Sequence, residues 1–170
     1  MKAKFSILLI CLFFLTIIGY SQTTAKWHAD RASKYWGDNE LALAIAEYTK
    51  VIEIDPNYES VYYNRATAKF LLGDYRGSIP DYNKAIESDP SGLNYAHRAD
   101  AKNSFGDING AIVDYTKAIE IGHWNVGSSY GRRGLCKLNL GQKDAACADF
   151  RKAGELGSKE AYEYINKYCQ

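Results

Sequence analysis

Cysteine is the residue type in this chain with the widest range of possible chemistry. Cys136, Cys147 and Cys169 lie in the last third of the sequence, and Cys11 lies in an apolar N-terminal run. Three is an odd number, so if Cys11 is removed at least one thiol stays free or pairs between chains. In an oxidising compartment the spacing leaves open Cys147–Cys169, Cys136–Cys169 and Cys136–Cys147. No Cys-x-x-Cys motif is present, which disfavours thiol catalysis.

The other residue types that commonly carry chemistry show no such pattern. His28, His97 and His123 are far apart, with no His-x₃-His or Cys-x₂-Cys spacing for a metal. The chain also lacks a G-x-S-x-G sequence, a glycine-rich phosphate loop and an H-E-x-x-H motif. We therefore expect no enzymatic activity, no metal and no cofactor.

Arginine and acidic residues recur at a fixed distance. Each of four arginines is followed 16 residues later by a carboxylate: Arg31 by Glu47, Arg65 by Asp81, Arg98 by Asp114, and Arg133 by Asp149. A guanidinium matches a carboxylate with two parallel hydrogen bonds. We expect each pair to join the two helices of one repeat, or one repeat to the next, and so to fix their register. This pairing favours a structural role for the acids over general acid–base catalysis.

The N-terminus has the organisation of a secretory signal peptide. Lys2 and Lys4 precede an apolar run from Phe5 to about Gly19, and small residues then precede a cleavage point after Ser21. The run is shorter than the ~20 residues that a spanning helix needs. We expect residues 1–21 to be removed and the protein to be exported, to the periplasm or the medium, without membrane insertion.

Charge argues against a nucleic-acid partner. The chain has 21 basic and 20 acidic residues, and loss of the two lysines of the signal segment leaves 19 against 20. Such a balance offers no basic surface for phosphate backbones.

The remaining sequence consists of internal repeats. Aligned aromatic positions at Tyr48, Tyr82, Tyr115 and Phe150 follow one another at steps of 34, 33 and 35 residues. A near-constant period of this length predicts a solenoid of stacked units. The repeats cover about residues 25–58, 59–91, 92–126 and 127–158.

Each repeat reads as two antiparallel helices. In the third repeat, Ala111, Tyr115 and Ala118 share one helix face, and small residues there let neighbouring helices approach closely. Asp74 and Asp107 follow a glycine and predict the N-caps of two second helices. A further apolar stripe at helical spacing predicts a capping helix over 159–169; its members are Ala161, Tyr164, Ile165 and Tyr168.

The pattern resembles the tetratricopeptide repeat. The shared features are a small residue in each first helix (Ala32, Ala66, Ala99 and Gly134), a glycine before the second helix, an Ala-x-x-x-Tyr/Phe-x-x-Ala stripe, and a closing proline at 56 and 90. The resemblance covers about residues 25–158. It implies an all-α, right-handed solenoid of four antiparallel helix pairs plus the C-terminal capping helix, forming one domain over 22–170.

In that family the first helices line a concave groove that binds other proteins. The resemblance therefore implies a non-enzymatic scaffold for a protein or peptide, monomeric or weakly self-associating. The positions carried over to the groove are Tyr63, Asn64, Thr67, His97, Asp100, Arg132 and Leu135. Some members grip a C-terminal carboxylate with Asn, Lys and Arg side chains. Here Leu93 and His97 stand where Lys and Arg belong, so that ligand is not expected. A thiol-redox factor and a self-associating structural protein are the alternative functions.

Overall fold

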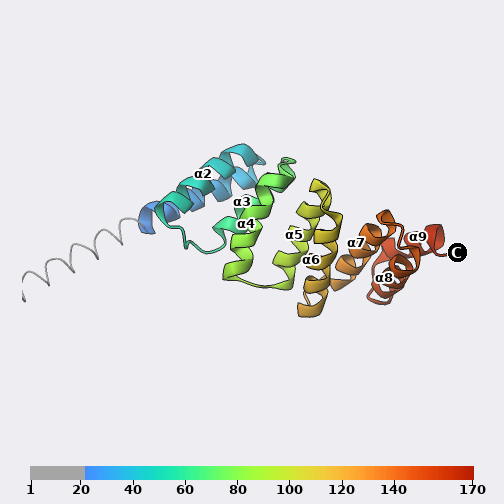
Figure 1. Cartoon of the computed structure of the whole chain (residues 1–170). Coiled ribbons are helices and arrows are strands. Elements are labelled where there is room, and N and C mark those ends of the chain that lie inside the picture. The colour runs from blue at the N-terminus through green and yellow to red at the C-terminus, as the bar shows by residue number, and fades with distance from the viewer. Residues whose placement is uncertain (1–21) are drawn as a thin grey trace, which may run out of the picture. The chain divides into compact units, whose positions relative to one another are not determined.

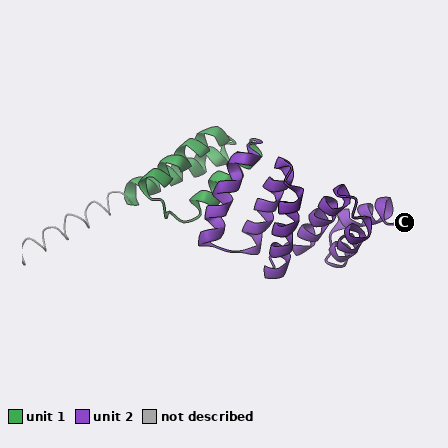
Figure 2. Cartoon of the chain, in the orientation of Figure 1, with its two compact units in different colours: residues 1–72 green, residues 73–170 purple. Residues whose placement is uncertain are grey.

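The computed structural model describes residues 22–170, and the predicted signal peptide lies outside the described residues. The described part of the chain is helical with short turns and contains no strand. It divides into two compact units, one ending at Leu72 and the other running from Gly73 to Gln170 (Figure 2). This boundary falls in the turn inside the second predicted repeat, where the sequence led us to expect one uninterrupted domain. No helix of residues 22–170 is long and apolar enough to cross a bilayer.

Unit 1 contains a helix over residues 22–37, then α2 (Leu41–Ile54) and α3 (Val61–Leu71). Its core is made largely of small side chains, which allow the helix axes to approach closely around one ring. That ring belongs to Tyr48, and the other buried members are Ala25, Ala32, Ala44, Val51 and Val61.

Unit 2 contains α4 (Tyr75–Ser88), α5 (Gly92–Phe105), α6 (Ile108–Ile121), α7 (Val126–Asn139), α8 (Lys143–Glu155) and α9 (Lys159–Tyr168). Each of these helices packs against the next one in the chain, as Figure 1 shows for the pairs α5–α6 and α7–α8. The predicted capping helix corresponds to α9, which packs on α8. The helix bounds follow the repeat period read from the sequence.

In the first, third and fourth repeats the aromatic residue of the second helix packs against the first helix. Tyr115 and Phe150 are fully buried. Gly134 of α7 lies against the Phe150 ring so closely that a Cβ there would be 2.6 Å from Phe150 Cε1. Contact with the aromatic ring of the second helix thus explains the small residue at Gly134, and Ala32 and Ala99 share core clusters with Tyr48 and Tyr115.

Local sequence signals decide where the second helices begin. The predicted N-caps at Asp74 and Asp107 are confirmed: each carboxylate accepts a hydrogen bond, at 2.9 Å, from the backbone N–H of Gly77 or Gly110. Such a bond satisfies a donor that would otherwise be left unpaired in the first turn. Gly106, with φ +99°, ends α5 in a conformation that L side chains rarely adopt.

Candidate functional site

Four of the predicted groove residues lie on the first helices of unit 2. His97 and Asp100 are on α5, and Arg132 and Leu135 are on α7. Arg132 forms an ion pair with Asp100, so the two helices present these side chains on a shared face. The Tyr115 hydroxyl, from α6, also donates to Asp100. Asp100 is therefore held from two neighbouring helices.

Burial shifts the pKa values of two side chains near Asp100, those of Tyr115 and His97. Burial raises the pKa of Tyr115, and the adjacent Asp100 carboxylate raises it further. Burial lowers the pKa of His97, whose ring stacks on Tyr82 with centroids 6.1 Å apart. Both side chains therefore stay neutral at physiological pH, and the charges on this face are those of Asp100 and Arg132.

A hollow of about 610 Å³ opens beside Arg132, and we call it the α7–α9 pocket. Its α7 side is lined by Asn125, Gly127, Ser128, Gly131, Arg132 and Leu135. Its other side is lined by Leu156, Gly157, Ser158, Lys159, Glu160 and Tyr164, from the end of α8 and from α9. Two predicted groove residues are therefore in the pocket, and the wall supplied by α9 was not predicted.

The other predicted groove residues belong to unit 1. Tyr63, Asn64 and Thr67 lie on α3, where the Thr67 hydroxyl donates to the Tyr63 carbonyl oxygen at 2.8 Å. Burial raises the pKa of Tyr63. Because the two units are described separately, a groove that joins these residues to His97 and Arg132 stays a prediction.

Two of the predicted arginine–carboxylate pairs lie within unit 2, and the structure contains both. Arg98 Nε and Nη2 donate to the two Asp114 oxygens at 2.8 and 2.7 Å. Arg133 makes the same two bonds to Asp149, at 2.9 and 2.8 Å. Both carboxylates are buried. Each guanidinium fork therefore joins the two helices of its own repeat.

The same arginines also reach the preceding repeat. Arg98 Nη1 donates to Asn83 Oδ1 of α4 at 2.9 Å, and Arg133 Nη1 donates to Thr116 Oγ1 of α6 at 3.0 Å. Each arginine thus connects three helices. Both alternatives that the sequence left open, linkage within a repeat and linkage between repeats, occur together.

A lysine completes each buried carboxylate site, and sequence analysis missed it. Lys102 Nζ lies 2.8 Å from Asp114, and Lys137 Nζ lies 2.8 Å from Asp149. Each lysine follows its arginine by one helical turn, as Lys69 follows Arg65. That spacing was the signal for a second cation on the same carboxylate.

The first repeat differs from the prediction. Among the described residues, the ion-pair partners of Glu47 are His28, at 2.5 Å, and Lys50, at 2.9 Å. Arg31 instead donates to the Tyr35 hydroxyl at 3.1 Å. Burial alone would raise the pKa of Glu47, but its hydrogen bonds with His28 and Lys50 outweigh burial and lower it. In place of the predicted Arg31–Glu47 pair, His28 contacts Glu47, and Arg31 contacts Tyr35, which follows its arginine by one helical turn as the lysines do in later repeats.

The predicted pair of Arg65 and Asp81 would connect α3 of unit 1 with α4 of unit 2. Within unit 1, Arg65 Nη1 donates to Thr49 Oγ1 of α2 at 3.1 Å. The bond to the preceding repeat therefore has the same form as in unit 2, while the pair with Asp81 stays a prediction.

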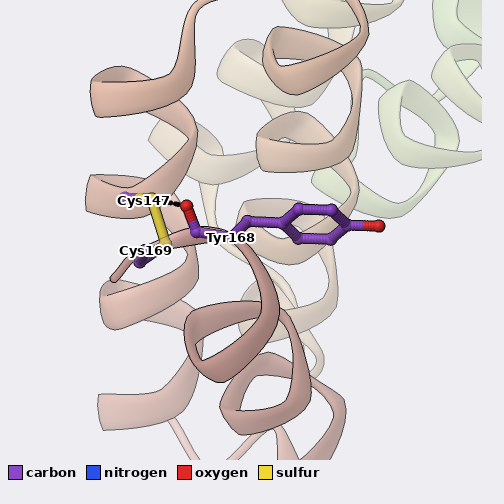
Figure 3. Close-up of a disulfide and its surroundings, with 3 residues drawn as sticks. All are labelled: Cys147, Tyr168 and Cys169. Atoms are coloured by element: carbon purple, nitrogen blue, oxygen red, sulfur yellow. Dashed lines mark hydrogen bonds between the residues drawn. A yellow bond between two sulfur atoms is a disulfide. The ribbon is translucent and has the colours of Figure 1, made fainter.

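Within residues 22–170 the three cysteines form one disulfide and leave one buried thiol. Cys147 of α8 is bonded to Cys169, directly after α9, with a Cα–Cα distance of 5.6 Å. Figure 3 shows this bond and Tyr168, whose carbonyl oxygen lies 3.7 Å from Cys147 Sγ. Burial and then Asp100 raise the pKa of the free Cys136 thiol to about 11. A buried, protonated thiol is a poor nucleophile, so the thiol-redox alternative gains no support.

Metal ligation finds no support in the described part of the chain. Residues 22–170 contain no group of three or more His, Cys, Asp or Glu side chains placed to hold a metal ion.

Family models match three stretches of the chain. Residues 38–73 match the TPR repeat model, and residues 59–91 and 127–156 match the tetratricopeptide repeat model.

Sequence relatives share short segments. Protein SGT1 homolog of Oryza sativa subsp. japonica is 41% identical over 61 residues, which are 36% of this chain and 17% of the relative. The small glutamine-rich tetratricopeptide repeat-containing protein beta of Homo sapiens is 38% identical over 52 residues, 31% of this chain and 17% of the relative. The chain thus spans about a sixth of the length of these proteins.

Solved structures match over much more of the chain. The crystal structure of MamA protein has a TM-score of 0.77 at 23% identity and covers 84% of this chain and 79% of its own. YrrB, described as a TPR protein with an unusual peptide-binding site, has a TM-score of 0.71 at 22% identity, covering 91% and 83%. The second TPR domain of human RPAP3, in complex with the HSP70 peptide SGPTIEEVD, has a TM-score of 0.58 at 28% identity, covering 64% and 92%. These likenesses confirm the all-helical solenoid fold expected from the sequence.

Proposed function

We propose that this chain, whose assignment to the tetratricopeptide repeat family is supported by the family models and by the solved structures, is a non-enzymatic scaffold that binds a protein or peptide segment. In this proposal the binding face lies within unit 2, on the first helices α5 and α7 of its repeats. The family models that match describe repeats and no catalytic domain.

The observation that carries this proposal is the α7–α9 pocket. Its wall on α7 includes Gly127 and Gly131, both buried, and a Cβ at Gly127 would lie 3.3 Å from the Leu156 Cβ. A Cβ at Gly131 would meet only the Ala153 Cβ, at 4.0 Å. Arg132, whose side chain is 52% exposed, stands at the same wall. A hollow of this size beside a half-exposed guanidinium suits a segment of another chain.

The structural neighbours point in the same direction. Two TPR domains of RPAP3 proteins are bound to peptides of HSP90 and HSP70 in their structures. A comparable role for this chain rests on the shared fold and on its own pocket, because function does not follow from fold alone.

We also propose that the protein acts outside the cytoplasm. The basic and then apolar N-terminal segment favours export. The Cys147–Cys169 disulfide favours an oxidising compartment, since cytosolic thiols are kept reduced. Fractionation of the native cells tests this proposal: a cytoplasmic protein that retains residues 1–21 would contradict it.

Partner capture tests the binding function. Tagged protein beginning at Gln22 would be cross-linked in its native compartment, and the captured proteins identified by mass spectrometry. The double variant Arg132→Ala/Leu135→Ala should lose the specific partners, whereas Arg151→Ala, an exposed arginine on α8 outside the pocket, should keep them. Partners kept by the double variant would place the binding face elsewhere. Capture of further copies of this chain alone, with a concentration-dependent mass in sedimentation, would favour the self-associating alternative.

A further inference from the structure

Asn109 is followed by Gly110 in the first turn of α6, and no other asparagine of the chain precedes a glycine. The Asn109 side chain is exposed. Glycine has no side chain to shield its backbone nitrogen, so that nitrogen can approach the side-chain amide of the preceding asparagine. The pair is therefore a candidate site of deamidation, a covalent change that converts the asparagine amide to a carboxylate.

This reaction needs water but no enzyme, oxidant or cofactor. The Gly110 backbone nitrogen gives up its proton to a solvent base and attacks Asn109 Cγ. A nitrogen–carbon bond forms, the bond from Cγ to Nδ2 breaks, and Nδ2 takes up a proton and leaves as ammonia. Water then opens the cyclic imide: addition at Cγ yields aspartate, and addition at the backbone carbonyl carbon yields isoaspartate, whose main chain runs through the side-chain carbons.

The folded structure holds the two reacting groups apart. The Gly110 N–H donates to the Asp107 carboxylate at 2.9 Å, so this nitrogen keeps its proton. In a helix ψ is about −42°, which turns the following nitrogen out of the plane that ring closure requires. The Ala111 N–H donates to the Asp107 carbonyl oxygen at 3.0 Å and fixes the same turn. Ring closure at Asn109 must therefore wait until the start of α6 opens locally.

The cap that blocks the reaction also explains why glycine stands at position 110. A Cβ there would collide with the Asp107 carboxylate. The second repeat has the same arrangement, with the Gly77 N–H bonded to the Asp74 carboxylate at 2.9 Å and the same collision for a Cβ. Its glycine follows Arg76, which has no side-chain amide. The two caps thus share their geometry, and of the two only that of α6 contains a reactive pair.

We propose that Asn109 is a deamidation site of this protein and that the Asp107 cap sets its rate, because only the locally opened form of α6 reacts. The observed rate is then the rate of the open chain multiplied by the fraction of molecules in which the cap is open. The proposal concerns a covalent modification and does not depend on the proposed binding function.

Isoaspartate at position 109 would weaken the start of α6. Its main chain is longer by one CH₂ group, so the N–H groups of Gly110 and Ala111 no longer meet Asp107 in register. Ala111 is buried in the core of the third repeat, and the lost cap therefore affects that packing. We expect faster amide hydrogen exchange in the first turn of α6 for the isoaspartyl form. The aspartyl form keeps the normal main chain and should exchange as the unmodified protein does.

The test is incubation of the protein from Gln22, with its disulfide intact, at mildly alkaline pH. Peptide mass spectrometry follows replacement of the Asn109 amide NH₂ by OH, and chromatography separates aspartyl from isoaspartyl peptides. Asn109 should react before any other asparagine, and more slowly in the folded protein than in the same protein unfolded in denaturant. Equal rates in the folded and unfolded protein, or an earlier reaction at another asparagine, would overturn the proposal.

Variants of the two caps identify what controls the rate. Asp107→Ala removes the capping acceptor and should speed deamidation at Asn109 about fivefold, the change in open population expected from loss of a helix cap. Asp74→Ala removes the equivalent cap of α4 and is the matched control, which should leave the rate at Asn109 nearly unchanged. An Asp107→Ala protein that reacts no faster than the wild-type protein would contradict the proposal.

A second reactive pair carries the test to another helix. Arg76→Asn places an asparagine before Gly77 within the Asp74 cap. This variant should deamidate at positions 76 and 109, and addition of Asp74→Ala should accelerate the reaction at position 76 alone. Asn109→Gln, whose longer side chain would have to close a larger ring, should remove the signal at position 109. If position 76 stays unreactive even with its cap removed, an asparagine–glycine pair released from its cap is not sufficient, and the mechanism is refuted.

Discussion

Removal of the Cys147–Cys169 disulfide should release α9 from the rest of unit 2. This helix has 10 residues, fewer than an isolated helix needs to be stable in water. Besides the disulfide, it is held by the rings of Tyr164 and Tyr168, whose centroids lie 5.1 and 6.5 Å from that of Phe150. The Tyr162 hydroxyl adds one hydrogen bond, at 3.3 Å, to the Gly154 carbonyl oxygen.

The expected loss of stability of α9 follows from the number of residues in the loop that the disulfide closes. The two cysteines are 22 residues apart. In the chain-entropy treatment, closure of such a loop destabilises the unfolded state by about 3 kcal/mol. Each aromatic pair contributes roughly 0.5–1.5 kcal/mol beyond the area it buries. The disulfide is therefore expected to be the largest single contribution to the attachment of α9.

The measurement is amide hydrogen exchange, because stacked repeats open locally and one global transition would average over them. The double variant Cys147→Ala/Cys169→Ala should lower the opening free energy of α9 amides by about 3 kcal/mol. Cys136→Ala is the matched control, since it removes a buried sulfur that makes no crosslink. That control should leave α9 protection unchanged.

Unchanged protection of α9 in the double variant would refute the reasoning and show that aromatic packing alone holds the helix. If α9 is released, the α7–α9 pocket loses the wall that carries Lys159 and Tyr164. Capture of the specific partners should then weaken in the double variant and in the wild-type protein treated with a dithiol reductant.

Three further outcomes are expected. The Gly134→Ala variant should lower the free energy of unfolding by about 1–3 kcal/mol, because its Cβ would meet an aromatic carbon at 2.6 Å, whereas Gly131→Ala should leave denaturant unfolding nearly unchanged. Arg98→Met and Asp114→Asn should show an interaction energy of about 1–3 kcal/mol in a double-mutant cycle, and strict additivity would mean that the pair contributes nothing. Because burial depresses the pKa of His97, the unfolded chain takes up its proton first as pH falls through 6.5, so stability declines below that pH. Replacement of His97 by Phe should flatten the dependence, and an unchanged pH profile would contradict the assignment.

The positions of the helices were predictable from the sequence because their determinants are local. Asp74 and Asp107 cap helices through bonds to residues three positions later, so the sequence contains both partners within one turn. The aromatic stripe and the small residues of the first helices repeat at a constant period, and the buried ring of Tyr115 shows why. Because the packing contacts between helices recur from repeat to repeat, they appear in the sequence as a periodic pattern of residue types.

The candidate site was predictable only in part. Arg132 and Leu135 followed from their place in the repeat, whereas Lys159 and Tyr164 did not. These two residues belong to α9, whose apolar stripe predicts a helix but not the side chains that it places opposite α7. That register depends on how α9 packs on α8, and the packing involves ring contacts with Phe150.

The sequence alone determined the repeat period, the helix pairs, the caps and the arginine–carboxylate spacing, because each depends on residues related by one helical turn or one repeat. Tertiary structure decided which cysteines pair, since three combinations have compatible spacing and only Cys147 and Cys169 are brought together. It also decided that Glu47 binds His28 in the first repeat and that Lys102 joins Asp114 in the third. Those choices depend on distances between side chains from different helices, which a one-dimensional pattern does not contain.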